Sequence, residues 1–273
     1  MSAPGAPGAV SIPDVLFSSA HGPLLLDIIR PDPVPDIPMP VVIYIHGGGW
    51  MSGDRRENRN GVLAPHGFFT ISIDYRLSHQ AIFPAQIEDA KTAVRWVRAH
   101  AAQYHLDPTR IGVWGHSAGA HLAALLGTSA GVAELEGAGE WAGYSSRVQA
   151  VATLAAPTDF LRMGGWHDDP DSPEARLVGG PIHERVDRVR MANPLTYVRS
   201  DAPPFLLLHG DDDTIVPIGQ SVLLHQALRA AGCDATFVPL AGASHDFDAD
   251  EPSWHETRRA VLAFFKRHLC GNE

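Results

Sequence analysis

Cysteine is scarce in this sequence of 273 residues, which contains only Cys233 and Cys270. Two cysteines cannot build the disulfide framework that holds small secreted domains together. We expect two free thiols, and the sequence leaves open a single bridge between them. The 15 histidines form no H-E-x-x-H motif and no cysteine–histidine cluster, so the sequence predicts neither a metal site nor a cofactor.

Long apolar runs and basic residues are also lacking. No hydrophobic stretch has the length that crosses a bilayer, and the start, MSAPGAPGAV, lacks the basic and apolar regions of a secretory signal. Lys and Arg number 21 against 31 Asp and Glu, which gives a net charge of -10 at pH 7. Such an acidic surface argues against nucleic acid or an anionic membrane as a partner. We expect a cytoplasmic monomer or homodimer that acts on a small molecule.

The length and the 45% hydrophobic content suffice for one large α/β domain. The Pro-, Gly- and Ala-rich start predicts a disordered tail over residues 1–12, followed by a single domain over 13–273. Short β-branched runs alternate with amphipathic stretches, which is typical of a mostly parallel sheet flanked by helices. Residues 161–200 break this alternation: an acidic, turn-rich run at 166–173 is followed by short helical pieces up to 194, and we interpret the whole segment as a small lid. The predicted strands are 15–17, 24–29, 41–45, 68–75, 111–114, 148–154, 204–208 and 235–240, and the predicted helices are 85–104, 118–127, 217–231 and 251–269.

The pentapeptide GHSAG at 115–119 lies between a predicted strand and a predicted helix. This is the setting of a G-x-S-x-G nucleophile elbow, in which a tight turn exposes the serine Oγ above the sheet. The flanking glycines are needed because a Cβ there would collide with the neighbouring backbone. We therefore predict Ser117 as a nucleophile, and such a serine requires a base, an acid and an oxyanion site.

The oxyanion site is predicted at HGGGW (46–50), where a buried strand runs into three glycines. The amide groups of Gly47, Gly48 and Gly49 would join that of Ala118 around the developing negative charge. We interpret His46 as a residue that orients this loop.

The acid and the base should follow the serine in the order Asp or Glu, then His. His245 lies in the loop after the last predicted strand and is the candidate base. Three consecutive aspartates, 211–213, follow the strand 204–208, and their chemistry alone leaves the choice among them open. The Asp74/Arg76 pair is interpreted as a structural clamp, and the cluster at 167–169 as a solvated face of the lid rather than a metal site.

The motifs HGGGW, DYR, GHSAGAH, HGxxDxxVP and SHDF, spread over residues 13–270, resemble those of the α/β-hydrolases. Within that superfamily the chain resembles the esterase/lipase branch that includes the hormone-sensitive-lipase-like enzymes. It is more similar to the BD-FAE-type acetyl and feruloyl esterases and to the related kynurenine formamidases. This resemblance implies an α/β-hydrolase fold with about eight mostly parallel strands. It also implies Asp213 as the acid, and Gly47, Gly48 and Ala118 as the oxyanion hole with Gly49 close by.

The resemblance implies a serine carboxylesterase that forms an acyl-enzyme on Ser117 and needs no cofactor. The chain departs from the hormone-sensitive-lipase-like pattern, which has GDSAG and a long N-terminal helical cap. Kynurenine formamidases usually carry an aromatic residue where Gly49 stands, which favours an ester over a formamide substrate. N-formylkynurenine-type amide hydrolysis is the alternative function. With only a small lid over the site, we expect short acyl groups and name Trp50, Phe83 and Trp166 as pocket walls.

Overall fold

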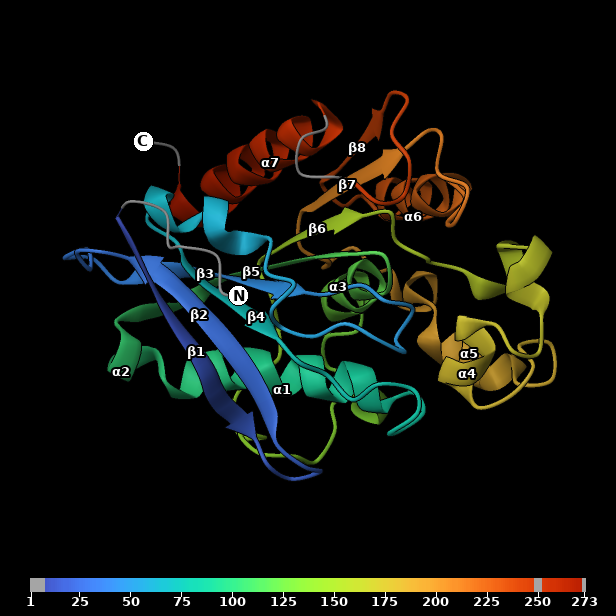
Figure 1. Cartoon of the computed structure of the whole chain (residues 1–273), viewed down its shortest axis with the longest axis horizontal. Coiled ribbons are helices and arrows are strands. Elements are labelled where there is room, and N and C mark those ends of the chain that lie inside the picture. The colour runs from blue at the N-terminus through green and yellow to red at the C-terminus, as the bar shows by residue number, and fades with distance from the viewer. Residues whose placement is uncertain (1–7, 248–251, 272–273) are drawn as a thin grey trace.

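The computed structural model describes residues 8–247 and 252–271, which form an eight-stranded sheet with the order β1-β2-β4-β3-β5-β6-β7-β8 (Figure 1). The pairs β1/β2 and β2/β4 are antiparallel, and the remaining pairs are parallel. The prediction of about eight mostly parallel strands is therefore confirmed. The strands are β1 Ala9–Ser18, β2 Leu24–Pro31, β3 Met39–Ile45, β4 Phe69–Ile73, β5 Leu106–His116, β6 Ala150–Leu154, β7 Phe205–Gly210 and β8 Ala235–Leu240.

The first strand begins at Ala9, so residues 9–12, which we predicted as part of a tail, belong to the sheet. Ser11 and Ile12 pair with β2, and this pairing outweighs the local Pro/Gly/Ala composition. Residues 1–7 lie outside the described residues. A register shift follows Ile12, and it falls on Pro13 and Asp14.

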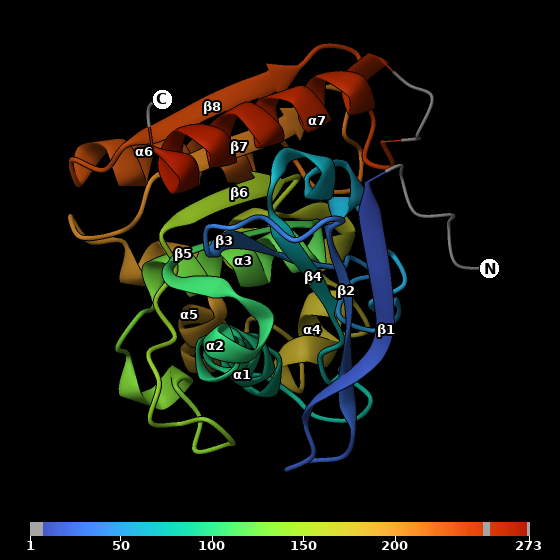
Figure 2. The same ribbon diagram turned by 90° about the vertical axis from the view of Figure 1, so that its left-hand side faces the viewer.

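The core is divided by the sheet into two clusters, because alternate residues of a strand point to opposite faces. Val41, Ile43 and Ile45 of β3 pack with α1 (Ala85–Ala99) and α3 (Ala118–Thr128). The residues between them pack on the other face with α7 (Pro252–Phe265). Figure 2 shows α7 on one side of the sheet and α1 on the other.

Two helical predictions need correction. The helix predicted over 85–104 breaks at His100 into α1 and a short α2 (Ala101–Tyr104). Helix α6 (Gly219–Ala230) begins two residues later than predicted. The closing helix agrees with its prediction to within one residue at its C-terminal end, where α7 continues as a π-helical turn, Lys266–Cys270. In the part of the chain that the structure describes, no helix combines the length and apolar character required to cross a membrane. Cys233 is a buried free thiol, so the bridge that the sequence left open is not formed.

The predicted lid contains two short helices, α4 (Pro173–Val178) and α5 (Val186–Ala192), joined to 3-10 turns. Helix α4 begins with a hydrogen bond from the Ala175 amide to the Ser172 Oγ and ends at Gly179, whose φ of 75° is easy only for glycine. Both helices lie at one end of the molecule in Figure 1.

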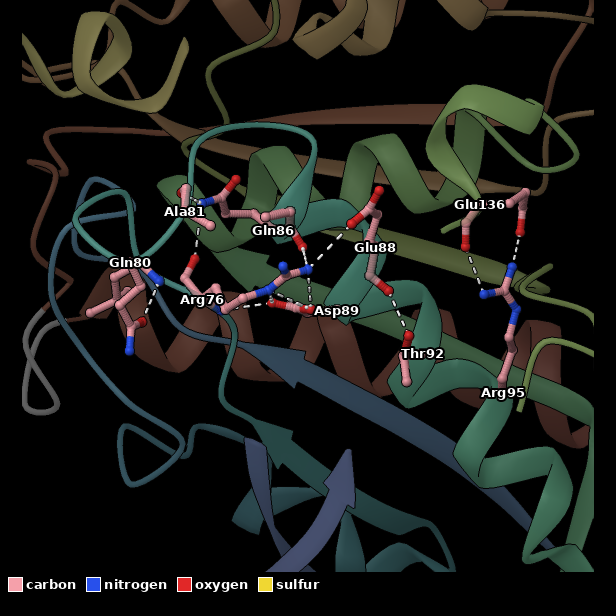
Figure 3. Close-up of polar contacts among 11 residues, drawn as sticks. Arg76, Gln80, Ala81, Gln86, Glu88, Asp89, Thr92, Arg95 and Glu136 are labelled. Atoms are coloured by element: carbon pink, nitrogen blue, oxygen red, sulfur yellow. Dashed lines mark hydrogen bonds and ion pairs between the residues drawn. The ribbon is translucent and has the colours of Figure 1, made fainter. Parts of the chain in front are cut away.

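The loop after β4 is fixed to α1 by Arg76, whose guanidinium forks around the Asp89 carboxylate with N–O distances of 2.7–3.0 Å (Figure 3). Gln86 Nε2 donates to the carbonyls of Arg76 and Ala81, also shown in Figure 3. Asp74, which we had paired with Arg76, instead accepts hydrogen bonds from Arg55. Both charged residues are structural, as predicted, but each has its own partner.

The two outer strands of the sheet are β1 and β8. The first is interrupted by the register shift at Pro13 and Asp14, and the second contains Pro239 opposite His209 of β7.

Candidate active site

Ser117 lies at the tip of a sharp turn between β5 and α3, with φ 55° and ψ −121°. A side chain in this region is strained, and the packing around the turn enforces it. A Cβ on Gly119 would lie 2.0 Å from the Ile45 carbonyl oxygen, and one on Gly115 would lie 2.4 Å from the Gly119 carbonyl carbon. The two glycines therefore permit the close approach of helix and strand that raises the serine above the sheet.

The structure brings the three predicted residues of the triad into one hydrogen-bonded chain. His245 Nε2 is 3.0 Å from Ser117 Oγ, and His245 Nδ1 is 2.7 Å from Asp213 Oδ2. A carboxylate can only accept, so Nδ1 carries the proton and Nε2 is free to accept from the serine hydroxyl. This is the tautomer that a general base requires.

Asp213 is the aspartate of the 211–213 run that reaches His245. Its Oδ1 accepts from the amides of Ile215 and Val216 at 2.9 and 2.8 Å. Burial alone would raise the pKa of Asp213, but hydrogen bonds from His209, His245 and the Val216 amide hold it well below its usual range. Asp213 is thus an anion at any pH at which the base is neutral.

The glycine loop packs directly against the elbow. A Cβ on Gly47 would lie 3.2 Å from the His116 carbonyl oxygen and 3.5 Å from Ser117 Cβ, while Gly48 and Gly49 have φ of 96° and 58°. Among the described residues, no backbone partner accepts from the amides of Gly48, Gly49 or Ala118. Free amides beside the serine are suited to hold an oxyanion.

Tyr75 fixes the start of this loop. Its hydroxyl donates to the carbonyls of His46 and Gly47 at 3.1 and 3.2 Å, and its ring stacks on the His46 imidazole at 4.3 Å. His46 Nδ1 also lies 2.8 Å from the Gly47 carbonyl oxygen. His46 therefore orients the loop, in accord with the interpretation from sequence, and the tyrosine of the DYR motif does the same.

Trp50 ends the loop and is 1% exposed, with a positive φ of 59°. Its Nε1–H donates to His121 Nδ1 at 3.2 Å, and the backbone amide of Ser78 donates to its carbonyl at 2.8 Å. Because His121 Nδ1 accepts, its Nε2 carries a proton and donates to the Ala192 carbonyl at 2.8 Å. His121 thus connects the glycine loop to the end of α5 in the lid.

A cavity of about 440 Å³ opens beside Ser117 and His245. Trp50 and Trp166 line it as predicted, the latter 49% exposed at the lid. The prediction of Phe83 as a wall is wrong, because Phe83 is not among the described residues that line the cavity. It is 1% exposed within the core, and its amide donates to the Leu177 carbonyl of α4. Polar residues form much of the remaining wall: Glu57, Arg59, His116, His167, Glu174 and Asp246.

His167 connects the lid to the loop that carries the acid, in what we call the lid contact. Its Nδ1 is 3.0 Å from Glu174 Oε1 and its Nε2 is 2.8 Å from the Ile215 carbonyl oxygen. Burial lowers the pKa of His167, but the Glu174 carboxylate outweighs burial and raises it above its ordinary value. Asp168 instead approaches His183, so the residues of this cluster have separate partners.

Sequence reasoning missed three histidines around the site. His116 Nε2 donates to the His245 backbone carbonyl at 2.9 Å, and its burial lowers its pKa to about 3. Burial likewise lowers the pKa of His121 to about 4. His209 lies beside Asp213, with its Nε2 3.3 Å from Oδ2. Each lies inside a motif that we had quoted, namely GHSAGAH or HGxxDxxVP, and that position was the available signal.

Comparison with known proteins places this geometry in a family. A sequence profile of the BD-FAE family matches residues 26–228. The esterases LipQ and LipC of Mycobacterium tuberculosis are 35% and 34% identical over 88% and 89% of this chain. The chain spans only 58% of the length of LipQ and 62% of LipC.

Two solved structures are similar over nearly their whole length. A truncated carbohydrate esterase from gut microbiota shares 32% identity over 96% of both chains, with a TM-score of 0.86. The esterase Est2 of Thermogutta terrifontis, with propionate bound, shares 29% identity over 99% of this chain and 98% of that one, with a TM-score of 0.80. The chain therefore belongs to the BD-FAE family, and its fold is that of the α/β-hydrolase esterases.

Proposed function

We propose that this protein is a serine carboxylesterase that hydrolyses short-chain acyl esters through an acyl-enzyme. The observation that carries the proposal is the hydrogen-bonded chain from Ser117 through His245 to Asp213, which lies at a strained elbow beside the glycine loop. The esterase names of the relatives support the same reaction class.

In the first half of the reaction, Ser117 Oγ attacks the ester carbonyl carbon and its proton passes to His245 Nε2. The carbonyl oxygen becomes an oxyanion and accepts hydrogen bonds from the amides of Gly47, Gly48 and Ala118, with that of Gly49 close by. His245 then returns the proton to the alkoxy oxygen, the C–O bond breaks and the alcohol leaves. Asp213 keeps the proton on Nδ1 and stabilises the imidazolium throughout.

In the second half, water attacks the acyl carbon and gives a proton to His245 Nε2. The tetrahedral intermediate collapses, the bond to Ser117 Oγ breaks and the serine takes back the proton. The carboxylic acid is then released. The described residues supply each of these proton transfers without any further group.

A short acyl group suits the cavity, which is roofed only by the small lid. The propionate in the related Est2 structure is a short acid of the same kind. The charged wall residues Glu57, Arg59 and Asp246 and the exposed Trp166 suit a polar, hydroxyl-bearing alcohol, and one similar structure is named a carbohydrate esterase.

The test is Ser117→Ala. Turnover of p-nitrophenyl butyrate should fall by roughly 10⁴- to 10⁶-fold while the circular dichroism spectrum stays native. A butyryl adduct on Ser117 should be seen by mass spectrometry in the wild type after rapid acid quench, and should be missing in the variant. Ser145→Ala, at an exposed serine, is the matched control and should be fully active. A folded Ser117→Ala protein with more than a tenth of wild-type activity would refute the proposal.

A further inference from the structure

Asp213 Oδ2 lies between two imidazoles rather than one. On one side is His245 Nδ1 at 2.7 Å, and on the other is His209 Nε2 at 3.3 Å. His209 is the penultimate residue of β7, and its side chain is 0% exposed. It touches neither Ser117 nor the cavity beside it.

The neighbours of His209 determine which of its nitrogens carries a proton. Nε2 faces the Val216 carbonyl oxygen at 2.8 Å as well as the Asp213 carboxylate, and both of these groups can only accept. Nε2 must therefore carry hydrogen and donate. Nδ1 lies 2.7 Å from Ser221 Oγ, a hydroxyl that can donate to it. The neutral imidazole with hydrogen on Nε2 satisfies every one of these contacts without a buried charge.

These contacts come from three elements. His209 is in β7, Ser221 is in α6, and Val216 lies in the loop that carries Asp213. The Val216 amide also donates to Asp213 Oδ1, so His209 bonds to the same turn whose amide binds the carboxylate. Asp213 Oδ2 is therefore in contact with both His245, the proposed base, and His209.

We propose that His209 is a positioning residue that both orients Asp213 and limits how strongly Asp213 stabilises protonated His245. The positive end of the His209 Nε2–H bond, 3.3 Å from Oδ2, competes for carboxylate charge with the imidazolium that forms on the other side. With His209 in place, protonated His245 is stabilised less, and the acid limb of the pH profile of turnover therefore lies at lower pH. This inference rests on the proposed function, because the pH dependence of turnover is its readout.

The experiment compares the pH profiles of kcat/KM, measured with p-nitrophenyl butyrate from pH 5 to 9. His209→Leu removes the donor while keeping a side chain of similar length, so protonated His245 becomes more stable. The midpoint of the acid limb should move up by about half to one pH unit, which is roughly a 3- to 10-fold greater loss at low pH. His209→Gln, whose Nε2–H can reach the same acceptors, should return the midpoint to within a few tenths of a unit.

Ser221→Ala is the milder variant, and it keeps the test decisive where His209→Leu does not fold. It leaves the imidazole in place but removes the hydroxyl that polarises it, so the shift should be smaller and in the same direction. Other charged groups face this site from neighbouring elements and are unchanged in all variants, so they cancel in the comparison. These groups are Glu57, Arg59, His116, His167, Glu174 and Asp246.

A purely structural role would lower kcat equally at every pH. If the folded variants lose activity uniformly, or keep the wild-type midpoint, His209 does not tune the base and the inference is overturned. That outcome is separate from failure of the proposed function, which is judged by Ser117→Ala alone.

Discussion

The carboxylate of Asp213 is closed to solvent and accepts three hydrogen bonds, from two backbone amides and from His245, while His209 Nε2 lies 3.3 Å from its Oδ2. Its two predecessors differ in surroundings, not in chemistry. Asp211 is exposed and its Oδ1 accepts from the Gly242 amide at 2.6 Å, whereas Asp212 is exposed and its backbone amide donates to the Ala243 carbonyl. Of the three aspartates, Asp213 is the one whose carboxylate contacts His245, the proposed base.

We expect Asp213→Asn to lower kcat by roughly 10⁴-fold, because an amide in that place presents a donor to His245 and selects the wrong tautomer. Asp211→Asn and Asp212→Asn are matched controls in the same loop and should each cost less than about tenfold. Steady-state kinetics at pH 8 decide between them. A larger loss of kcat in either control than in Asp213→Asn would show that Asp213 is not the acid of the triad.

For single residues, the sequence predicts features that depend on order along the chain. It cannot predict features that depend on the direction in which a side chain points. Ser117 and His245 follow from a turn motif and from order along the chain. Asp213 required the family pattern, since three aspartates in a row are chemically alike. Phe83 was misplaced because an aromatic residue before Pro84 looks the same whether it lines a cavity or fills the core.

At the scale of elements, the position of the lid depends on the lid contact, in which His167 faces both Glu174 and the Ile215 carbonyl oxygen. Both side chains are buried, and both nitrogens of His167 face acceptors. The pKa of His167 is raised in the folded protein, so its contribution to stability is complete below the ordinary value near 6.5. That contribution is lost as the pH rises through the raised folded value. The lid should therefore be held less firmly at alkaline pH.

Glu174→Gln tests this pH dependence. The amide oxygen still accepts a hydrogen bond but carries no charge, so we expect a loss on the order of 1–3 kcal/mol at pH 6. The loss should be smaller at pH 9, because His167 releases its proton as the pH rises through its raised pKa. Thermal unfolding at both values, with hydrogen exchange of residues 161–178, provides the measurement. Glu184→Gln, at an exposed lid residue, is the control, and an equal loss at both pH values would contradict the account.

Element boundaries were predicted less well than element types, because pairing and packing decide where a strand or helix ends. Residues 9–12 join the sheet because β2 offers them partners. The break in the long helix at His100 places its Nδ1 2.8 Å from the Trp96 carbonyl, and helical periodicity gives no sign of it. The lid was predicted as an insertion with short helical pieces up to residue 194, and α4 and α5 lie in that segment, but the sequence did not give their bounds.

At the scale of the whole molecule, the proposed function predicts a limit on the length of the acyl chain. With a cavity of about 440 Å³ under a small lid, each methylene left in water forgoes about 0.8 kcal/mol of binding. In a p-nitrophenyl ester series from acetate to palmitate, kcat/KM should be highest from acetyl to butyryl and should fall beyond about eight carbons. An optimum at dodecanoate or longer would refute the argument. A preference of tenfold or more for N-formylkynurenine would identify an amide hydrolase instead.

Acid should destabilise the molecule well above the pH at which carboxylates titrate. Burial lowers the pKa of His116 to about 3 and of His121 to about 4, whereas in the unfolded chain both bind protons near pH 6.5. Their contribution is complete above pH 6.5 and is lost as the pH falls toward the folded values. The melting temperature should decline from pH 6.5 to pH 4, and His121→Gln should flatten that decline. A melting temperature that stays constant over this range would show that protonation of these histidines does not destabilise the fold.

The proline at each outer strand of the sheet bears on how copies of the protein meet one another. A strand from a second molecule needs a continuous row of free backbone donors and acceptors, and Pro13 with its register shift interrupts that row on β1. Pro239 lacks the donor on β8. Over the described residues, neither end of the sheet is therefore a template for cross-molecular β-pairing. We expect concentrated solutions to resist fibril growth, and any association between copies to use helical or loop surfaces.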